Sequence, residues 1–290
     1  MDGVGRGREV DVRTLVTGAG GQVGQAVGAA LGSRELVAVT HADLDLADRD
    51  RVEQALDEIA PDAVINCGAL TDVDRCEHDV DAAFAANALG VRNLAAAATR
   101  VGAHVVHIST DYVFDGRSTT PYDEWAPVAP LSEYGRSKLA GERELARHAS
   151  SWTVVRAAWV FGRRGGDFVS WVLAAVGRGE TPPVVDDQRS SPTYAPDLAA
   201  TLVALAAARR PGIFHVTNAE TATRLELATA ALSCRGLDPG SVKPVSFADL
   251  DRPAARPTYS VLDNRALRIA GLPALRSWRD ALAEYLGGAQ

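Results

Sequence analysis

Hydrophobic and polar positions alternate between two patterns in the first half of the chain. Short apolar runs bounded by glycine, proline or polar residues are typical of buried strands. The longer stretches between them have the 3.6-residue period of amphipathic helices. Together the two patterns indicate right-handed βαβ units, and therefore a doubly wound parallel sheet with helices on both faces. The predicted strands cover residues 13–17, 36–40, 63–66, 104–109 and 153–160, and the predicted helices residues 22–31, 51–59, 82–101 and 134–147.

The pattern changes after Phe161, where glycine and proline become frequent. A clear helix is predicted at residues 194–208 and a further strand at 213–217, and both are expected to return to the sheet. The rest of the chain predicts a helix from Thr223, a short strand at 242–246, a loop rich in proline and arginine, and a closing helix at 278–286.

We therefore expect an α/β fold with a sheet domain at residues 12–160 and a smaller, interleaved C-terminal α/β lobe. The lobe would consist of residues 161–193 and 218–287, which we expect to bind the substrate. Residues 1–11 are expected to form a flexible extension.

Composition and charge exclude several classes of protein. The 290 residues are 47% hydrophobic and 23% charged, which argues against intrinsic disorder. No stretch of about 18 residues is uniformly apolar, so we expect no membrane span, and the polar N-terminus lacks the apolar core of a signal peptide. The formal net charge is −7 and no run of lysine or arginine exceeds two, which argues against nucleic-acid binding. Cys67, Cys76 and Cys234 suit neither a disulfide framework nor a zinc site, so we expect a cytoplasmic location.

A glycine-rich turn directly follows the first predicted strand and begins the first predicted helix. Gly18, Gly21 and Gly24 have the spacing G-x-x-G-x-x-G. Such a turn brings backbone without Cβ atoms, and the N–H groups of a helix N-terminus, against a diphosphate. We therefore expect a dinucleotide cofactor, NADPH or NADH. The second strand ends at Thr40-His41 with no acid directly after it, and this leaves the choice between the two cofactors open.

Tyr134 and Lys138 are spaced i and i+4, which places a phenol and an ammonium on one helix face. The ammonium lowers the pKa of the phenol, so the tyrosine can act as a general acid or base near neutral pH. The lysine can also hold the ribose of a nicotinamide cofactor. Ser109 and Thr110 follow the fourth predicted strand, where open α/β sheets bind ligands, and either hydroxyl could bond to the reacting oxygen.

These three features together resemble the extended branch of the short-chain dehydrogenase/reductase superfamily. Over residues 13–286 the chain is similar, more narrowly, to the dTDP-4-dehydrorhamnose reductase family. The runs that carry this resemblance are, in chain order, NCGALTDVDRCE at 66–77, STDYVFDG at 109–116, Tyr134–Lys138 followed by Gly141-Glu142, RAAW at 156–159 and DQRSSPT at 187–193.

The resemblance implies a Rossmann-type NAD(P)-binding domain and reduction of the C4 keto group of a dTDP-4-keto-6-deoxy-L-hexose, foremost dTDP-4-dehydro-L-rhamnose. Tyr134 would protonate the C4 oxygen, Lys138 would tune Tyr134 and bind ribose, and Thr110 would orient the oxygen. The implied cofactor contacts are Gly18, Gly21, Gln22, Val23, Gly24, Asp45, Leu46, Gly68, Ala69, Leu70, Tyr134 and Lys138.

On the substrate side, the resemblance implies that Asp111 contacts sugar hydroxyls and that Trp159 packs against the sugar. The nucleotide end needs cations and an apolar slot. Arg252 and Arg256 are candidates for binding the diphosphate, and Phe168 is a candidate wall of the pocket. The acidic metal ligands known near the C-terminus of some family members have no match at residues 279–290, so we expect no metal. We keep a homodimer as a hypothesis.

Two positions depart from the family pattern. Leu70 stands where the family usually has an aromatic residue or histidine beside the nicotinamide, and Gly68 replaces an alanine. The departure keeps open a 4-ketoreductase for another dTDP-deoxysugar in natural-product biosynthesis.

Two further alternatives share the fold. A sugar-nucleotide epimerase or dehydratase also has the Tyr/Lys pair, but Asp111-Tyr112 lacks the second acid expected of a 4,6-dehydratase. A noncatalytic regulatory subunit, such as the reductase-like one of the methionine adenosyltransferase complex, would have no need of an intact pair.

Overall fold

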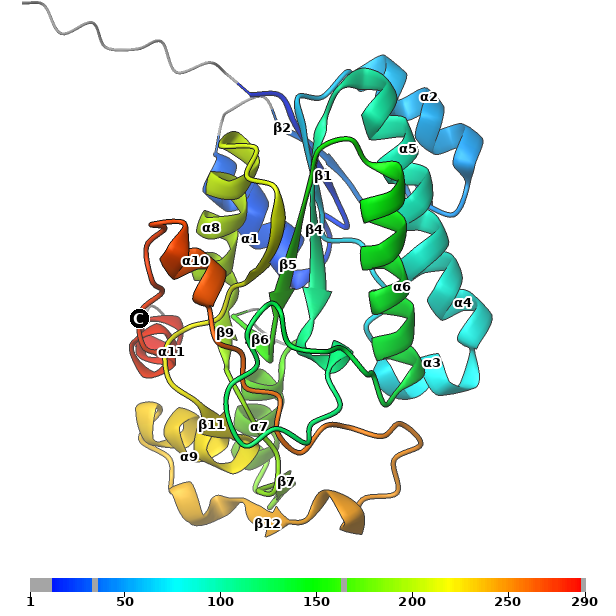
Figure 1. Cartoon of the computed structure of the whole chain (residues 1–290). Helices are drawn as coiled ribbons and strands as arrows, with labels where there is room; N and C mark the ends of the chain where they lie inside the picture. Colours follow the sequence, from blue (N-terminus) through cyan, green and yellow to red (C-terminus); the bar gives the residue numbers. More distant parts are fainter. Residues whose placement is uncertain (1–11, 33–35, 163–165, 288–290) are drawn as a thin grey trace, which may run out of the picture.

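The centre of the molecule is a six-stranded parallel sheet with the strand order β10-β5-β4-β3-β1-β2 (Figure 1). The computed structural model describes residues 12–32, 36–162 and 166–287, so the extension expected at residues 1–11 lies outside the described residues. The strand order reverses between β1 and β3, and ligands of open α/β sheets bind at the carboxyl ends of strands at such a point. The strands are β1 (Thr14–Thr17), β2 (Leu36–Val39), β3 (Ala63–Asn66), β4 (His104–Thr110), β5 (Trp152–Ala157) and β10 (Gly212–His215).

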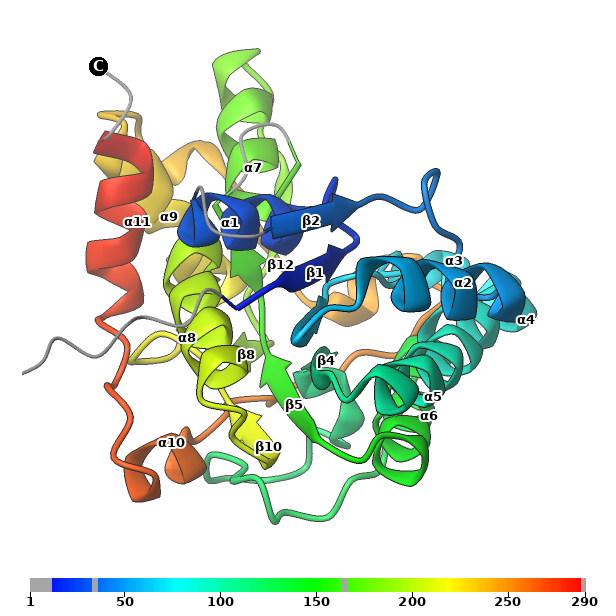
Figure 2. The ribbon, with the colours of Figure 1, turned by 90° about the horizontal axis from the view of Figure 1, so that it is seen from above.

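Helices cover both faces of the sheet, as the view from above shows (Figure 2). Along β3, Val64 packs into the core on one face and Ile65 into the core on the other, which is the alternation expected of a strand buried on both sides. The predicted α/β fold with a doubly wound parallel sheet is therefore confirmed. One face carries α1 (Gln22–Leu31) and α8 (Ala195–Ala207), and the other α2 (Arg49–Ile59), α5 (Gly90–Val101) and α6 (Glu133–His148).

The single helix predicted at residues 82–101 is interrupted. It consists of α4 (Val80–Phe84), a π-helical turn η1 (Ala85–Leu89) and α5. Inside the π turn, the Asn87 side chain accepts the N–H of Leu70 at 2.9 Å and donates to the Leu70 carbonyl at 3.0 Å. Such turns often occur at functional sites, and this one fixes the backbone that follows β3. Apolar periodicity could not reveal it, because the bulge is stabilised by these distant contacts.

The strand predicted at residues 153–160 ends early, at Ala157. Trp159 has a φ of +46°, which is strained for an aromatic residue and turns the chain. The next residues form β6 (Val160–Phe161), which pairs with β9 (Thr193–Tyr194). The strand prediction failed here because surrounding packing, and not local propensity, fixes the conformation of Trp159.

The smaller lobe lies beyond the carboxyl edge of the sheet, in the lower part of Figure 1. Two clusters of buried apolar side chains join its helices α7 (Phe168–Gly177), α9 (Arg224–Cys234) and α11 (Trp278–Gly287). Between these segments in sequence, α8 and β10 belong to the sheet layer, because β10 pairs with β5. The lobe is therefore interleaved with the sheet. Its short strands are β7 (Pro183–Val185), β8 (Arg189–Ser190), β11 (Ala222–Thr223) and β12 (Lys243–Val245).

The remaining short elements of the described chain are helical: α3 (Val73–His78), η2 (Asp111–Val113), η3 (Pro239–Ser241), η4 (Phe247–Asp249) and α10 (Arg265–Ile269).

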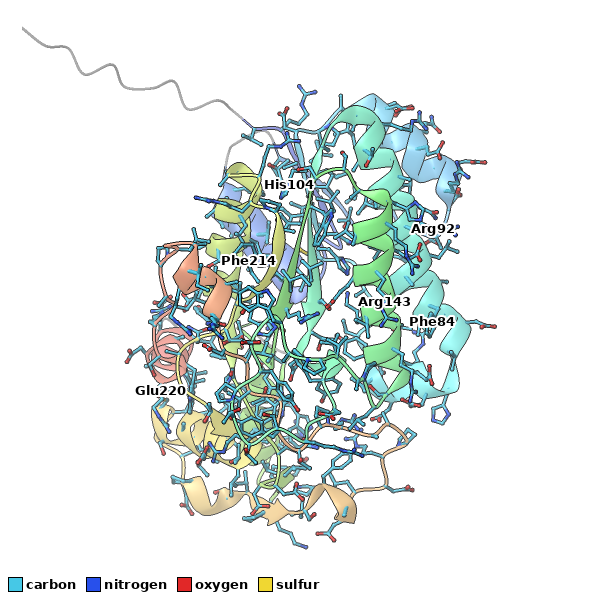
Figure 3. The ribbon with its side chains drawn as sticks, viewed as in Figure 1. Phe84, Arg92, His104, Arg143, Phe214 and Glu220 are labelled. Carbon is cyan, nitrogen blue, oxygen red and sulfur yellow. The ribbon has the colours of Figure 1, made fainter. Side chains whose placement is uncertain are left out.

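The residues described at the amino ends of the central strands hold the sheet together. His104 lies there, at the start of β4 (Figure 3). Its ring nitrogens contact the hydroxyls of Ser151 at 2.8 Å and Thr153 at 2.9 Å, and burial lowers its pKa to about 4. The ring is therefore neutral and holds β4 to β5. In the described part of the chain, no helix has the length and apolar character needed to cross a membrane.

Candidate active site

Three adjoining pockets follow the carboxyl edge of the sheet and continue over the lobe. The first pocket has a volume of about 460 Å³ and includes Thr17, His41 and Leu46 in its walls. The central pocket is of similar volume, about 460 Å³, and the lobe pocket is about 400 Å³. The first and central pockets share Ala69, and the central and lobe pockets share Arg224, so the three form one long cleft.

The sequence-predicted residues are distributed along this cleft. Gly24 is not among the described residues that line it. The first pocket takes in Gly18, Asp45, Leu46, Gly68, Ala69 and Leu70; the central pocket Gly21, Gln22, Val23, Ala69, Thr110, Asp111, Tyr134, Lys138, Trp159 and Phe168; and the lobe pocket Phe168, Arg252 and Arg256.

The glycine turn is required by close backbone contacts. Gly18 has a φ of +66°, and a Cβ atom there would lie 2.5 Å from the backbone nitrogen of Gly68. A Cβ atom on Gly24 would lie 2.3 Å from the Gly18 carbonyl oxygen, so Gly24 allows α1 to pack against the turn. The two glycines bring the start of α1 beside the ends of β1 and β3, at the reversal of strand order.

A dinucleotide cofactor fits this cradle. The first turn of α1 has no side-chain cap, and its residues Gly21, Gln22 and Val23 line the central pocket, where their environment suits an anion. Among the described residues, the buried side-chain nitrogen of Gln22 has no hydrogen-bond partner, so it can donate to a bound ligand. The first pocket adds the apolar surface of Leu46 and Leu70, which suits a flat base.

Two acids, Asp43 and Asp45, follow β2 within a few residues, and Asp45 lines the first pocket. Asp43 accepts hydrogen bonds from the backbone N–H of Thr40 at 2.8 Å and from its hydroxyl at 2.7 Å, and these bonds lower the pKa of Asp43. Arg75, which sequence reasoning missed, also lines this pocket. The first pocket is therefore lined by an acid, Asp45, as well as by His41 and Arg75, and these groups leave the choice between the two cofactors open.

Tyr134 lies in the first turn of α6, which Ser132 caps by accepting the N–H of Gly135 at 3.2 Å. Gly135 permits close packing, because a Cβ atom there would lie 2.3 Å from the Tyr112 carbonyl oxygen. Burial raises the pKa of Tyr134 well above its ordinary value, and a hydrogen bond with the Thr110 side chain acts in the opposite direction. The phenol is therefore protonated at neutral pH, and the lowering of its pKa by Lys138, which the i, i+4 spacing led us to expect, is not found: burial outweighs it.

Lys138 lies one helical turn further along, and it is 2% exposed. Burial lowers its pKa to about 8, although the nearby Glu142 acts to raise it. The Glu142 carboxylate is itself engaged by Arg156, with Nε–Oε1 and Nη2–Oε2 distances of 2.9 and 2.7 Å, and by the Ser109 hydroxyl at 2.5 Å. The Ser109 hydroxyl is therefore bound to Glu142, and Thr110 supplies the hydroxyl beside Tyr134.

Asp111 joins the lobe to the sheet. Its Oδ1 accepts the Thr110 hydroxyl at 3.0 Å, and its Oδ2 accepts the hydroxyls of Ser260 at 2.5 Å and Ser190 at 3.2 Å. Burial raises the pKa of Asp111 to about 6 in spite of these bonds. Both carboxylate oxygens are thus already bonded within the protein, so Asp111 also fixes Thr110 in the central pocket.

Arg224 is a site residue that sequence reasoning missed. Its guanidinium carbon lies 3.8 Å from the centre of the Trp159 ring and 4.9 Å from that of Phe168. Among the described residues its side chain has no hydrogen-bond or ion-pair partner, and burial lowers its pKa. The Thr223-x-x-Glu226 capping box marks the start of α9 in the sequence, but only the docking of the lobe brings Arg224 to the boundary of the central and lobe pockets.

The two arginines predicted for a diphosphate have a partner in the sheet domain. Asp74 on α3 pairs with Arg252 at 3.0 Å and with Arg256 at 2.9 Å, and the latter guanidinium also lies over the Phe247 ring. Gln188 lines the same lobe pocket, and its buried side-chain nitrogen has no partner among the described residues. Among the described residues, the central pocket and the lobe pocket therefore each contain a buried amide nitrogen without a hydrogen-bond partner.

Comparison with known proteins places these features in a family. A family model described as RmlD substrate binding domain matches residues 12–290. The chain is 44% identical over 283 residues to a dTDP-4-dehydrorhamnose reductase of Mycobacterium tuberculosis (strain H37Rv), covering 94% of this chain and 92% of the relative. It is 42% identical over 275 residues to a dTDP-4-keto-6-deoxy-D-glucose reductase of Streptomyces niveus, covering 94% and 96%.

The fold is also similar to that of solved structures. A crystal structure of dTDP-4-dehydrorhamnose reductase from Bacillus anthracis in complex with NADP superposes with a TM-score of 0.93 and 34% sequence identity. The match covers 97% of this chain and 100% of that one.

Proposed function

This chain belongs to the dTDP-4-dehydrorhamnose reductase family, as its motifs indicated, and from this premise we propose that it reduces the C4 keto group of a dTDP-4-keto-6-deoxy-L-hexose with NADPH or NADH. The preferred substrate is dTDP-4-dehydro-L-rhamnose. The observation that carries the proposal is the meeting of Tyr134, Lys138 and Thr110 in the central pocket, between a glycine cradle at one end and an arginine-lined pocket at the other.

In this proposal the cofactor supplies the hydride that reaches C4 when it is bound in the first and central pockets. Tyr134 delivers a proton to the C4 oxygen, and Thr110 orients that oxygen by turning its hydroxyl hydrogen from Asp111 to the substrate. The positive charge of Lys138 offsets the phenolate left on Tyr134, which burial would otherwise disfavour. The protein thus holds two reactants in line and stabilises charge where it develops.

The substrate nucleotide is proposed to lie in the lobe pocket, with its diphosphate at the boundary with the central pocket. Arg224 lies there with donors that have no partner among the described residues, and its guanidinium carbon lies over the rings of Trp159 and Phe168. Arg252 and Arg256 add positive charge further along the pocket, and Gln188 offers a donor to the base. Residues 161–193 and 218–287 would then serve as the substrate lobe.

The direct test supplies dTDP-4-dehydro-L-rhamnose, generated in situ, and follows NADPH and NADH absorbance separately. We expect stoichiometric loss of absorbance with at least one cofactor, and a fall in kcat of about 10²–10⁴-fold in Tyr134→Phe. Tyr259→Phe is the matched control, because the same hydroxyl is removed from a side chain outside the three pockets. Cofactor binding without consumption would reject this substrate.

A second candidate is a 4-ketoreductase for another dTDP-deoxysugar. The similarity to the Streptomyces niveus reductase favours it, as do Leu70 and Gly68, which depart from the usual family residues. Parallel assays with several dTDP-4-keto-6-deoxyhexoses distinguish the two by their kcat/KM values. A cytoplasmic location and a homodimer stay predictions.

A further inference from the structure

Three buried polar side chains on adjacent strands, Thr17 on β1, Asn66 on β3 and His107 on β4, form a chain of contacts that reaches a fourth, Lys138, and the mechanism above leaves these three unused. The Thr17 hydroxyl donates to Asn66 Oδ1 at 2.7 Å, Asn66 Nδ2 lies 3.0 Å from His107 Nδ1, and His107 Nε2 lies 3.3 Å from Lys138 Nζ. None of the four is more than 2% exposed. Asn66 and His107 are register partners in neighbouring strands, so the sheet itself aligns this chain of contacts.

The direction of each hydrogen bond follows from one backbone group. The N–H of Gly68, which can only donate, lies 3.0 Å from Asn66 Oδ1. The other side-chain atom of Asn66 is therefore its amide nitrogen, which can only donate, and it faces His107 Nδ1. His107 Nδ1 must then offer a lone pair, so the neutral ring carries its hydrogen on Nε2.

This tautomer directs a donor at the Lys138 amine. A hydrogen bond from His107 Nε2 to Nζ forms when Lys138 offers a lone pair, whereas an ammonium would place donor against donor. Burial and Lys138 both lower the pKa of His107 well below its ordinary value, so His107 does not itself become charged.

The other groups around Lys138 provide no strong compensation. Its titratable and charged neighbours are Cys67 after β3, His107 on β4, and Tyr134 and Glu142 on α6. Burial raises the pKa of Cys67 to about 12, which keeps the thiol neutral. Glu142 is ion-paired to Arg156, so its charge is already balanced.

We propose that His107 is a positioning residue for the catalytic amine: held as its Nε2–H tautomer by Asn66, it opposes the charge of Lys138 and fixes the place of Nζ whenever the amine is neutral. The same Asn66 oxygen holds Gly68, which lines the first pocket. Through Asn66 and His107, the protonation of Lys138 is thus linked to the backbone of Gly68, which borders the cofactor site. The proposal rests on the proposed role of Lys138, but its test uses protein without cofactor or substrate.

The test exploits the lysine content of the chain, which has only Lys138 and the exposed Lys243. In protein labelled with [¹³C,¹⁵N]lysine, each side chain gives its own NMR titration curve, and Lys243 is the internal reference. We expect Lys138 to titrate near pH 8, against about 10.4 for an ordinary lysine. Titration of Lys138 together with Lys243 would overturn the proposal.

A second measurement reads the tautomer directly. In [¹⁵N]histidine-labelled protein, His107 should show an unprotonated Nδ1 and a protonated Nε2 across neutral pH. The opposite tautomer contradicts the proposal, because Nε2 would then accept from an ammonium. Both measurements use the wild-type chain, so neither depends on the folding of a variant.

Variants then separate positioning from a structural role. His107→Gln can accept from Asn66 and donate to Lys138, so the Lys138 midpoint should stay within about half a pH unit of wild type. In Asn66→Asp, the new carboxylate accepts a hydrogen bond from Nδ1–H of His107, so Nε2 offers a lone pair to the Lys138 ammonium. The midpoint of the Lys138 titration should then rise by about one pH unit or more. Asn66→Asp combined with His107→Leu measures how far the new carboxylate raises the Lys138 midpoint directly, without the histidine. If the midpoint rises as much in this double variant as in Asn66→Asp alone, the proposal is contradicted. Absence of reductase activity would instead bear on the proposed function alone.

Discussion

The two ends of the cleft are built in different ways. The cofactor end is built around backbone at the ends of adjacent strands, where Gly18 lies against Gly68. The nucleotide end is made of long side chains, such as Arg224 and Arg256, that reach in from segments far apart in sequence. The first kind of site is fixed by local chain geometry, whereas the second depends on how the lobe docks against the sheet.

The central pocket is where the two kinds of construction meet. Thr110 and Tyr134 come from the sheet domain, but Thr110 is held by Asp111, whose other oxygen binds Ser190 and Ser260 of the lobe. The position of Thr110 therefore depends on contacts that the lobe makes with Asp111. This comparison predicts that substitutions at the cofactor end act on backbone fit, and those at the nucleotide end act on charge.

The largest effect is expected for Gly18→Ala. The positive φ alone costs about 1–3 kcal/mol, and a Cβ atom 2.5 Å from the Gly68 nitrogen adds to it, so cofactor affinity should fall about 100-fold or more. Gly20→Ala is the control in the same turn, because its Cβ atom would lie no closer than 3.6 Å to Thr40. Fluorescence titration with NADPH measures both, and equal losses would show that the turn tolerates a Cβ atom.

This contrast also explains what the sequence could predict. The β1–turn–α1 unit follows from the spacing of glycines, and the Tyr134–Lys138 pair follows from the helical period, because both depend on residues close in sequence. Arg224 could not be found in this way, since it meets Trp159 only through the packing of α9. The Asn66–His107 contact likewise depends on strand register, which an isolated sequence pattern does not specify.

The pH dependence of stability tests the contact that Asp111 makes between the sheet and the lobe. The folded-state pKa of Asp111, about 6, lies above its ordinary value of 3.8, so the folded protein binds this proton more tightly than the unfolded chain does. The resulting stability is fully present below pH 3.8 and is lost as the pH rises through 6. Relative to Asp111→Asn, the free energy of unfolding of the wild type should therefore fall by up to about 3 kcal/mol between pH 4 and 7.

Urea unfolding of both proteins at several pH values measures this difference, because all other groups titrate alike in the two. A difference that stays constant with pH would mean that Asp111 is solvated and that the lobe does not close over it. Asp111→Asn should also lower kcat, since an amide oxygen is a weaker acceptor than a carboxylate and holds the Thr110 hydroxyl less firmly.

At the nucleotide end, Arg224→Met should weaken dTDP binding by about 10-fold, because hydrogen bonds to a charged group contribute about 1.5–3 kcal/mol. Since Arg224 lies on the side of the lobe pocket next to the central pocket, we expect it to meet the phosphate nearer the sugar. Binding of dTMP, which lacks that phosphate, should change less than about 3-fold. Calorimetry with both ligands checks this, with Arg178→Met as control, because Arg178 directly follows α7 and is 58% exposed. Equal losses for dTDP and dTMP would instead assign Arg224 to the packing of Trp159 and Phe168.

The smallest effect is expected for Arg252→Ala. Its side chain is 55% exposed and already pairs with Asp74, and exposed ion pairs contribute only about 0–1 kcal/mol, so dTDP affinity should fall less than about 5-fold. Arg256 shares the same partner but is 16% exposed and lies over Phe247, so Arg256→Ala should weaken binding more. Calorimetric titration of the two variants with dTDP gives the ranking. If Arg252→Ala instead lost about 30-fold, Arg252 must exchange Asp74 for the diphosphate when substrate binds. The nucleotide end would then be assembled by the ligand and not by the docking of the lobe alone, and the difference between the two ends would be one of timing as well as of construction.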